Sequence, residues 1–238
     1  MSRSLALLAY TVYLLFGLRL LWHFWSWTRA TRLLKLPSAV NQRTSFGTRM
    51  LMTLDVIFFR RVFVANGMLW TGSFAFHLSF LLVLLRHLRY FMEPVPVWVQ
   101  DLQTCGLISG YILPVAVLWL LSIRVFSSKD RYLTYDNYLI LGLVFVIGLT
   151  GLLMTTVFRP DLVLIKEFAF GLLVFRPGPL RGEYLFLFHF LAVLLLVLLL
   201  PSHIFSAPVV TMEARRREQS LNSLMHEEHA AAGPGAHG

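Results

Sequence analysis

Long apolar runs, each bounded by polar or charged residues, dominate the pattern of the chain. A helix needs about 20 mostly apolar residues to cross the hydrocarbon core of a bilayer. Inside that core every backbone polar group must be satisfied within its own segment, so each run is expected to be helical. Five runs meet this length: 5–27, 67–91, 102–126 with Pro114 inside, 138–158, and 184–207 with Pro201 inside. The pattern predicts an all-α fold, an integral membrane five-helix bundle.

Two shorter segments mix apolar and charged positions. Residues 50–64 (MLMTLDVIFFRRVFV) fit a helix that lies along the cytoplasmic interface, and residues 162–175 (LVLIKEFAFGLLVF) fit a similar helix on the outer side. From position 211 the chain becomes polar and ends in HEEHAAAGPGAHG. We therefore expect a transmembrane domain over 1–210 and a cytoplasmic, partly disordered tail over 211–238.

Composition excludes an ordinary water-soluble domain. Hydrophobic residues make up 57% of the 238 positions and charged residues 14%, whereas soluble domains carry about 25% charged residues. Cys105 is the single cysteine, which excludes an internal disulfide framework and an iron-sulfur cluster held by this chain's cysteines alone. If the chain handles electrons, it needs another carrier.

The net charge of +9 is distributed unevenly between the loops. Thirteen basic residues fall on one side of the predicted helices, seven on the other, and Arg19 within the first. The positive-inside rule then places the amino terminus outside and the tail in the cytoplasm. The charge is thereby explained as a topology signal, and no nucleic-acid partner is expected. The richer side comprises Arg29, Arg32, Lys35, Arg43, Arg49, Arg60, Arg61, Arg124, Lys129, Arg131, Arg215, Arg216 and Arg217.

Four histidines lie within two of the predicted helices. His77 and His87 are ten residues apart on the second, a rise of about 15 Å, and His189 and His203 are fourteen apart on the fifth, about 21 Å. These helices run in opposite directions, so His87 falls level with His189 and His77 level with His203. The unequal rises require a kink, which Pro201 can supply.

Ionisable groups are costly inside a membrane, so these histidines indicate a function. A haem iron takes one axial imidazole on each face, and two haems at two depths let electrons cross most of the bilayer. A haem-free transporter or proton channel is an alternative, but such proteins use membrane carboxylates, and the two histidine helices contain none within their spans. A purely structural anchor is a third alternative. His23, among tryptophans, is expected to be interfacial.

The second and fifth segments carry a resemblance to a known family. FHLSFLLVLLRH, with its ten-residue histidine spacing, and HFLAVLLLVLLLPSH resemble the gamma subunits of respiratory nitrate reductases, which are di-haem cytochrome b membrane subunits. The fourteen-residue gap looks more like the branch that serves sulfite reductase-linked or heterodisulfide reductase-type complexes. The resemblance implies two haem b groups, with His77 and His203 on the inner haem and His87 and His189 on the outer haem, the same pairing that the depths predict.

Two further groups of residues are candidates for ligand contacts. Arg86, Arg89 and Arg181 are candidate partners of haem propionates, because guanidinium groups bind carboxylates through paired hydrogen bonds; interfacial arginines that snorkel to lipid headgroups are the alternative. Lys166 and Glu167 are candidate contacts of a quinone head group, with an exposed surface pair as the alternative.

These features predict the electron-transfer subunit of a respiratory oxidoreductase in a prokaryotic cytoplasmic (inner) membrane. Electrons would pass between a quinol/quinone pool (menaquinone or ubiquinone) near the outer face and a cytoplasmic iron-sulfur subunit, with the terminal catalytic site on a further subunit. The basic loop 28–66 and Arg215–Arg217 are candidate docking elements for that partner, or plain topology and lipid-binding charge. The same fold in a sulfur-metabolism complex is the alternative within this class.

Overall fold

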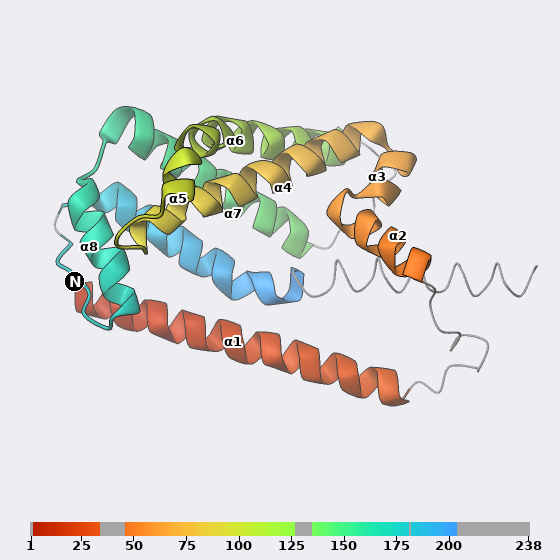
Figure 1. Cartoon of the computed structure of the whole chain (residues 1–238), viewed down its shortest axis with the longest axis horizontal. Coiled ribbons are helices and arrows are strands. Elements are labelled where there is room, and N and C mark those ends of the chain that lie inside the picture. Colours follow the sequence, from red (N-terminus) through yellow and green to blue (C-terminus); the bar gives the residue numbers. More distant parts are fainter. Residues whose placement is uncertain (1, 34–45, 127–134, 181, 204–238) are drawn as a thin grey trace, which may run out of the picture. The chain divides into compact units, whose positions relative to one another are not determined.

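The computed structural model describes residues 2–33, 46–126, 135–180 and 182–203 (Figure 1). Within these ranges the chain is helical and contains no strand. Five helices are long and apolar enough to cross a membrane: Ser2–Ser26, Gly67–Tyr90, Gln103–Phe126, Tyr138–Phe158 and Tyr184–His203. The predicted all-α protein with five membrane helices is confirmed, although residues 204–207 of the fifth prediction lie outside the described part.

The chain divides into two compact units that are described separately. The first holds residues 1–17 and 62–200, and the second holds 18–61 and 201–238. The segment Tyr184–His203 is called the last helix below. The other elements, in chain order, are α1 (Ser2–Leu33), α2 (Phe46–Ile57), α3 (Arg60–Ala65), α4 (Gly67–His87), η2 (Leu88–Tyr90), α5 (Val97–Asp101), α6 (Gln103–Phe126), α7 (Tyr135–Leu153), η3 (Met154–Phe158) and α8 (Leu162–Leu173).

In the first unit, α4 and α6 pack closely because small residues line their contact. A Cβ on Gly72 of α4 would lie 2.6 Å from Cδ1 of Trp119, and a Cβ on Gly106 of α6 would lie 2.7 Å from Cβ of Arg86. Ser79 is buried on α4 as well. Small residues let membrane helices approach until their backbones are in van der Waals range. This packing fixes α4, the helix that carries two of the four membrane histidines.

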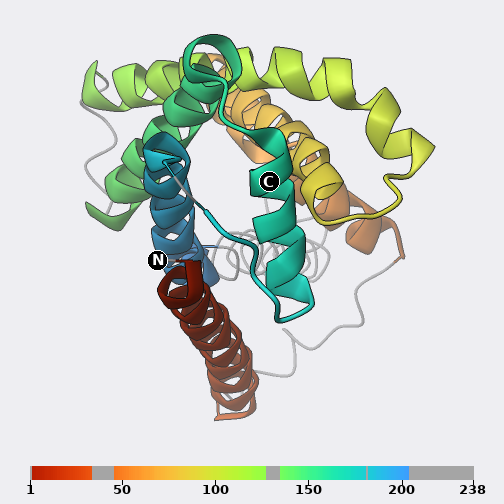
Figure 2. The same cartoon turned by 90° about the vertical axis from the view of Figure 1, so that its left-hand side faces the viewer.

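Two apolar clusters hold the remaining helices of this unit. One joins α6, α7 and the last helix through Leu113, Val117, Leu120, Leu141, Val144 and Leu196. The other joins the start of α1, α8 and the last helix through Leu5, Ala6, Ala9, Val12, Ile165, Phe168, Leu172, Leu180, Phe186 and Leu194. Figure 2 shows α8 at one end of the unit, where it contacts η2 and its Phe168 packs edge-on against Phe186 and Phe190 of the last helix.

The amphipathic segment 162–175 forms the helix expected of it, α8. Asp161 caps its amino terminus by accepting hydrogen bonds from the backbone amides of Val163 and Leu164. An aspartate at this position satisfies amides that have no partner inside the helix. The structure does not test the predicted interfacial depth of α8, which stays a prediction.

The segment 50–64 differs from the prediction of a single helix, which is wrong. The chain forms α2 and α3 with a break at Phe58 and Phe59, and Phe59 has a positive φ of 51°. In the second unit, the buried carboxylate of Asp55 pairs with Arg60 at 3.9 Å and with Arg61 at 3.7 Å. The break has no signal in the sequence, because apolar residues continue across it. The predicted tail, 211–238, lies outside the described residues, so the predicted domain boundary stays a prediction.

The close contact at Gly72 makes it a sensitive position. The Gly72→Leu variant should lower the stability of the folded protein by about 1–3 kcal/mol, because the added side chain must displace Trp119 and Leu120 from a filled contact. Thermal unfolding in detergent measures this loss. Gly110→Leu on α6 is the matched control, since nothing lies within 4 Å of its Cβ position. Equal melting temperatures of the two variants would contradict the packing argument.

Candidate functional site

Two of the predicted ligands, His87 and His189, face one another in the first unit. Their imidazole rings are nearly parallel, with an interplanar angle of 7° and ring centres 6.5 Å apart. His87 ends α4, and His189 lies in the first half of the last helix. Helix rise and antiparallel direction predict that these two histidines lie at one level, and the structure brings their rings together.

The hydrogen bond of His87 decides which ring nitrogen can act as a ligand. Its Nδ1 lies 2.7 Å from the backbone oxygen of Val83, one turn earlier in α4. A carbonyl oxygen only accepts, so Nδ1 carries the hydrogen and Nε2 keeps the lone pair of the neutral imidazole. An imidazole in this tautomer is prepared to bind a metal ion through Nε2.

His189 is prepared in a similar way, but by a different helix. Its Nδ1 lies 2.8 Å from Oγ1 of Thr150 on α7. The neighbouring Gly151 provides space for the ring, because a Cβ there would lie 3.4 Å from Cε1 of His189. The imidazole thus rests against α7 and is held there through Nδ1.

The spacing of the two rings fits a shared metal ion. Metal–imidazole bonds are about 2 Å long, so two imidazoles on opposite sides of one ion have ring centres about 6 Å apart. The observed 6.5 Å and the parallel rings match this arrangement. Haem iron with two axial histidines has this donor set. The chemistry of these residues therefore fits a haem, and their role as haem ligands stays a prediction.

The second predicted pair is described only in part. Nδ1 of His77 lies 2.7 Å from the backbone oxygen of Ser73, so its Nε2 is also the nitrogen with the lone pair. His203 ends the last helix and belongs, with Pro201, to the second unit. The pairing of His77 with His203 and the kink at Pro201 stay predictions.

Arg86 and Arg89, the candidate propionate partners, converge on one side chain of α6. Arg89 donates to Oε1 of Gln103 at 2.8 Å, and Nε of Arg86 lies 3.4 Å from the same oxygen. Arg89 also donates to the hydroxyl of Tyr90 at 2.8 Å and lies over its ring. Two guanidinium groups thus gather next to His87, where they can meet an anionic group. Arg181, the third candidate, lies outside the described residues.

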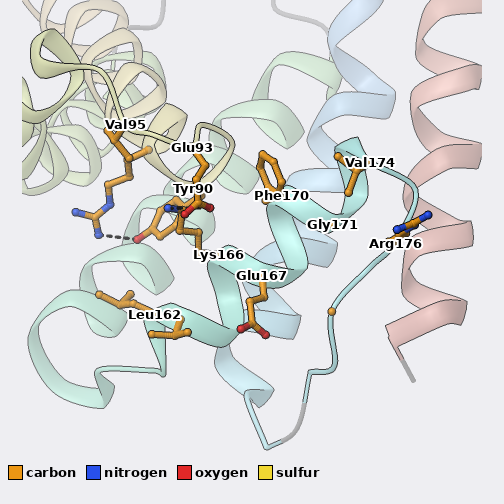
Figure 3. Close-up of a pocket in the computed structure, with 13 residues that line it drawn as sticks. Tyr90, Glu93, Val95, Leu162, Lys166, Glu167, Phe170, Gly171, Val174 and Arg176 are labelled. Atoms are coloured by element: carbon orange, nitrogen blue, oxygen red, sulfur yellow. Dashed lines mark hydrogen bonds and ion pairs between the residues drawn. The ribbon is translucent and has the colours of Figure 1, made fainter.

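A cavity of about 810 Å³ lies beside this arginine cluster (Figure 3). This volume is within the range of about 300–1,000 Å³ that is typical of small-molecule sites. Arg89 and Tyr90 lie on its wall, and both candidate quinone contacts, Lys166 and Glu167, line it as well. Arg89, on the cavity wall, lies two residues after His87 in the chain.

The cavity wall has one charged part and one apolar part. Nζ of Lys166 lies 3.4 Å from Oε2 of Glu93, and Figure 3 shows both near Tyr90, whereas Glu167 lies apart from them. The apolar part includes Leu162, Val163, Phe170 and Val174 of α8 and its C-cap. Such a wall suits a ligand with a polar head and an apolar body.

Four residues of the site were not predicted from the sequence: Thr150, Gln103, Tyr90 and Glu93. Thr150 offered a weak signal, since it is a polar residue inside an apolar membrane run. Glu93 and Tyr90 offered none, because they join the site only when η2 and the following turn fold against α8.

Comparison with known proteins finds two curated relatives, both named "Hdr-like menaquinol oxidoreductase cytochrome b-like subunit". The protein of Archaeoglobus profundus is 27% identical over 241 aligned residues, which cover 82% of this chain and 72% of the relative. The protein of Archaeoglobus fulgidus is 28% identical over 210 residues, which cover 71% of this chain and 63% of the relative. The similarity supports a cytochrome b-like membrane subunit, and neither relative is named as a nitrate reductase. No family model matches the chain, and no solved structure matches it.

Proposed function

We propose that this protein is a membrane cytochrome b subunit that exchanges electrons between a quinol pool and a partner subunit of an oxidoreductase complex. The observation that carries the proposal is the parallel pair of rings of His87 and His189, each with Nδ1 engaged in a hydrogen bond. The names of the two relatives support the same class of protein.

The histidines perform the binding step. His87 and His189 would hold the outer haem b, and the pair predicted from the sequence, His77 and His203, would hold the inner one. A bound haem supplies an iron that accepts and releases one electron at a time. The helices α4, α7 and the last helix keep the outer pair in place through the hydrogen bonds to Nδ1 of each ring.

The cavity between the 90–95 segment and α8 holds the quinol head group. Lys166 donates a hydrogen bond to one quinol oxygen. The carboxylate of Glu93 accepts a proton from a quinol hydroxyl, as a general base within reach of that proton. Phe170 and Val174 contact the apolar part of the ring and tail. Glu167, at the cavity wall, is a second acceptor by which the proton reaches the outer aqueous face.

The two relatives favour one of the branches left open by the sequence. Their names point to a heterodisulfide reductase-type complex and to menaquinol as the donor, whereas the likeness to nitrate reductase gamma subunits is a resemblance of sequence motifs alone. The cytoplasmic partner is then an iron-sulfur subunit, with terminal chemistry on a further subunit. Arg86 and Arg89 would neutralise the carboxylates of a haem bound beside His87 through charge-assisted hydrogen bonds.

A spectrum of the purified full chain tests the proposal. We expect a b-type absorption spectrum that is reduced by dithionite and by a short-chain menaquinol, and a pyridine haemochrome assay that gives about two haems per chain, one for each histidine pair. A colourless protein that carries out ion transport in vesicles would contradict the proposal and support the haem-free transporter.

A further inference from the structure

Thr150 lies on a helix that carries none of the four membrane histidines, yet it contacts one of them. Its side chain is buried, with 6% of the residue exposed. Its hydroxyl oxygen lies 2.8 Å from the backbone oxygen of Val146, 3.0 Å from that of Ile147, and 2.8 Å from Nδ1 of His189. A buried hydroxyl with three polar neighbours has a defined hydrogen-bond role.

The direction of these hydrogen bonds follows from the neighbours. The two carbonyl oxygens only accept, so the single hydroxyl hydrogen of Thr150 points towards its own helix. The hydroxyl oxygen is then the acceptor that faces His189, and the hydrogen between them belongs to Nδ1. Thr150, together with the backbone oxygen of Ile147 that also bonds to His189, therefore holds His189 in the tautomer that presents Nε2 as the ligand nitrogen.

The two facing histidines differ in how they are held. His87 bonds to a carbonyl of its own helix, Val83 in α4, so the partner that orients its ring belongs to α4 itself. His189 lies on the last helix but bonds to α7, and the ring rests on Gly151 of that helix. The orientation of the His189 ring thus depends on a side chain from another helix.

We infer that Thr150 is a positioning residue that sets the orientation and the electron donation of His189, and through them the midpoint potential of the outer haem. The inference rests on the proposed function. A hydrogen bond from the second nitrogen raises the basicity of a metal-bound imidazole. A more basic imidazole stabilises the oxidised iron more than the reduced iron, so the hydrogen bond from Nδ1 to Thr150 keeps the midpoint potential low.

The Thr150→Val variant tests this inference, because valine keeps the shape and removes the hydroxyl acceptor, leaving His189 only the backbone oxygen of Ile147. In the full chain we expect haem to remain bound while the outer haem becomes easier to reduce. At a fixed ambient potential, the ratio of reduced to oxidised outer haem should rise by about tenfold, which is a shift of 59 mV for a one-electron couple. Redox titration followed by absorbance measures the shift, and electron paramagnetic resonance of the oxidised haem reports the change in ring orientation.

Two further variants separate positioning from packing. Thr150→Ser retains the hydroxyl and should restore the wild-type potential and resonance signal. Thr156→Val is the matched control: Thr156 bonds to the backbone oxygen of Leu152 with the same local geometry, but it is exposed, and its substitution should leave both readouts unchanged.

The outcomes distinguish this inference from the proposed function. If Thr150→Val binds haem with an unchanged potential and resonance signal, the inference is overturned while the proposed function stands. If Thr150→Val loses the outer haem and Thr150→Ser keeps it at the wild-type potential, the inference is supported. Loss of the outer haem from both variants overturns it, because the hydroxyl alone then does not suffice. If the wild-type chain carries no haem, the proposed function itself fails.

Discussion

Alanine in place of His87 or His189 is expected to remove one of two haems from the purified chain. Each substitution leaves a single axial imidazole where the structure provides two parallel rings with centres 6.5 Å apart. An iron with one axial histidine is no longer held from both faces, so its affinity falls and any haem that remains changes its spin state. Haem per chain, from the pyridine haemochrome assay, should fall to about half of the wild-type value.

The two variants should lose the same amount of haem, and this equality is the more specific part of the prediction. His87 and His189 come from different helices, so a purely local effect on folding would not affect both equally. Quinol-dependent reduction of the remaining haem should be abolished in each, because the proposed cavity lies next to His87. His23→Ala on α1 is the matched control, a histidine at the end of a membrane span that the proposal leaves without a haem. An unchanged haem content in either variant would refute the assignment of this pair.

The membrane helices were predictable because their driving force acts along the sequence. A segment that must satisfy its own backbone inside lipid needs an uninterrupted apolar run, and such a run is visible without knowledge of its neighbours. The structure accordingly begins its second span at Gly67 and ends its third and fourth at Phe126 and Phe158, the residues that the hydropathy pattern predicts. The break at Phe59 was not predictable, because a positive φ in a bulky residue is imposed by the surroundings of the chain and not by its own preference.

For the candidate site, the common level of the two histidines was predictable from the sequence, but the residues around them were not. The level of His87 and His189 follows from helix rise and antiparallel direction alone, and the structure places their rings nearly parallel with centres 6.5 Å apart. The residues around them could not be found in this way. Gln103 meets Arg86 and Arg89 only because Gly106 lets α6 approach α4, and that approach is a property of two helices together.

The ion-pair partner of Lys166 was also not predictable from the sequence. The sequence singled out Lys166 with its neighbour Glu167, because adjacent charges in an apolar run are conspicuous. The structure instead pairs Lys166 with Glu93, 73 positions earlier. A helix separates the directions of consecutive side chains by about 100°, so two adjacent residues of α8 cannot face the same ligand equally. The functional pair therefore has to be sought across the cavity.

The cavity pair leads to the second large effect. In the variants Glu93→Gln and Lys166→Met, we expect menaquinol-dependent haem reduction to fall by about 100-fold or more, the range for loss of a positioned proton acceptor. Glutamine keeps the size of Glu93 but cannot accept a proton, and methionine keeps the apolar stem of Lys166 without its donor. Dithionite should still reduce both haems fully, because neither residue contacts the facing histidines. Stopped-flow absorbance with a short-chain menaquinol measures the rate.

The contrast between the two reductants makes this experiment decisive. Asp101→Asn on α5 is the matched control, since Asp101 is an exposed carboxylate near the same end of α4 that does not line the cavity, and it should reduce at the wild-type rate. Slow reduction by menaquinol with normal haem content places the defect at the quinol and not at the iron. If both cavity variants reduce as fast as Asp101→Asn, the quinol binds elsewhere on the chain, while the histidine assignment is unaffected. The experiments therefore test the histidine pair and the quinol cavity independently. The first assignment depends on the geometry of two rings, and the second depends on the charged residues of the cavity wall.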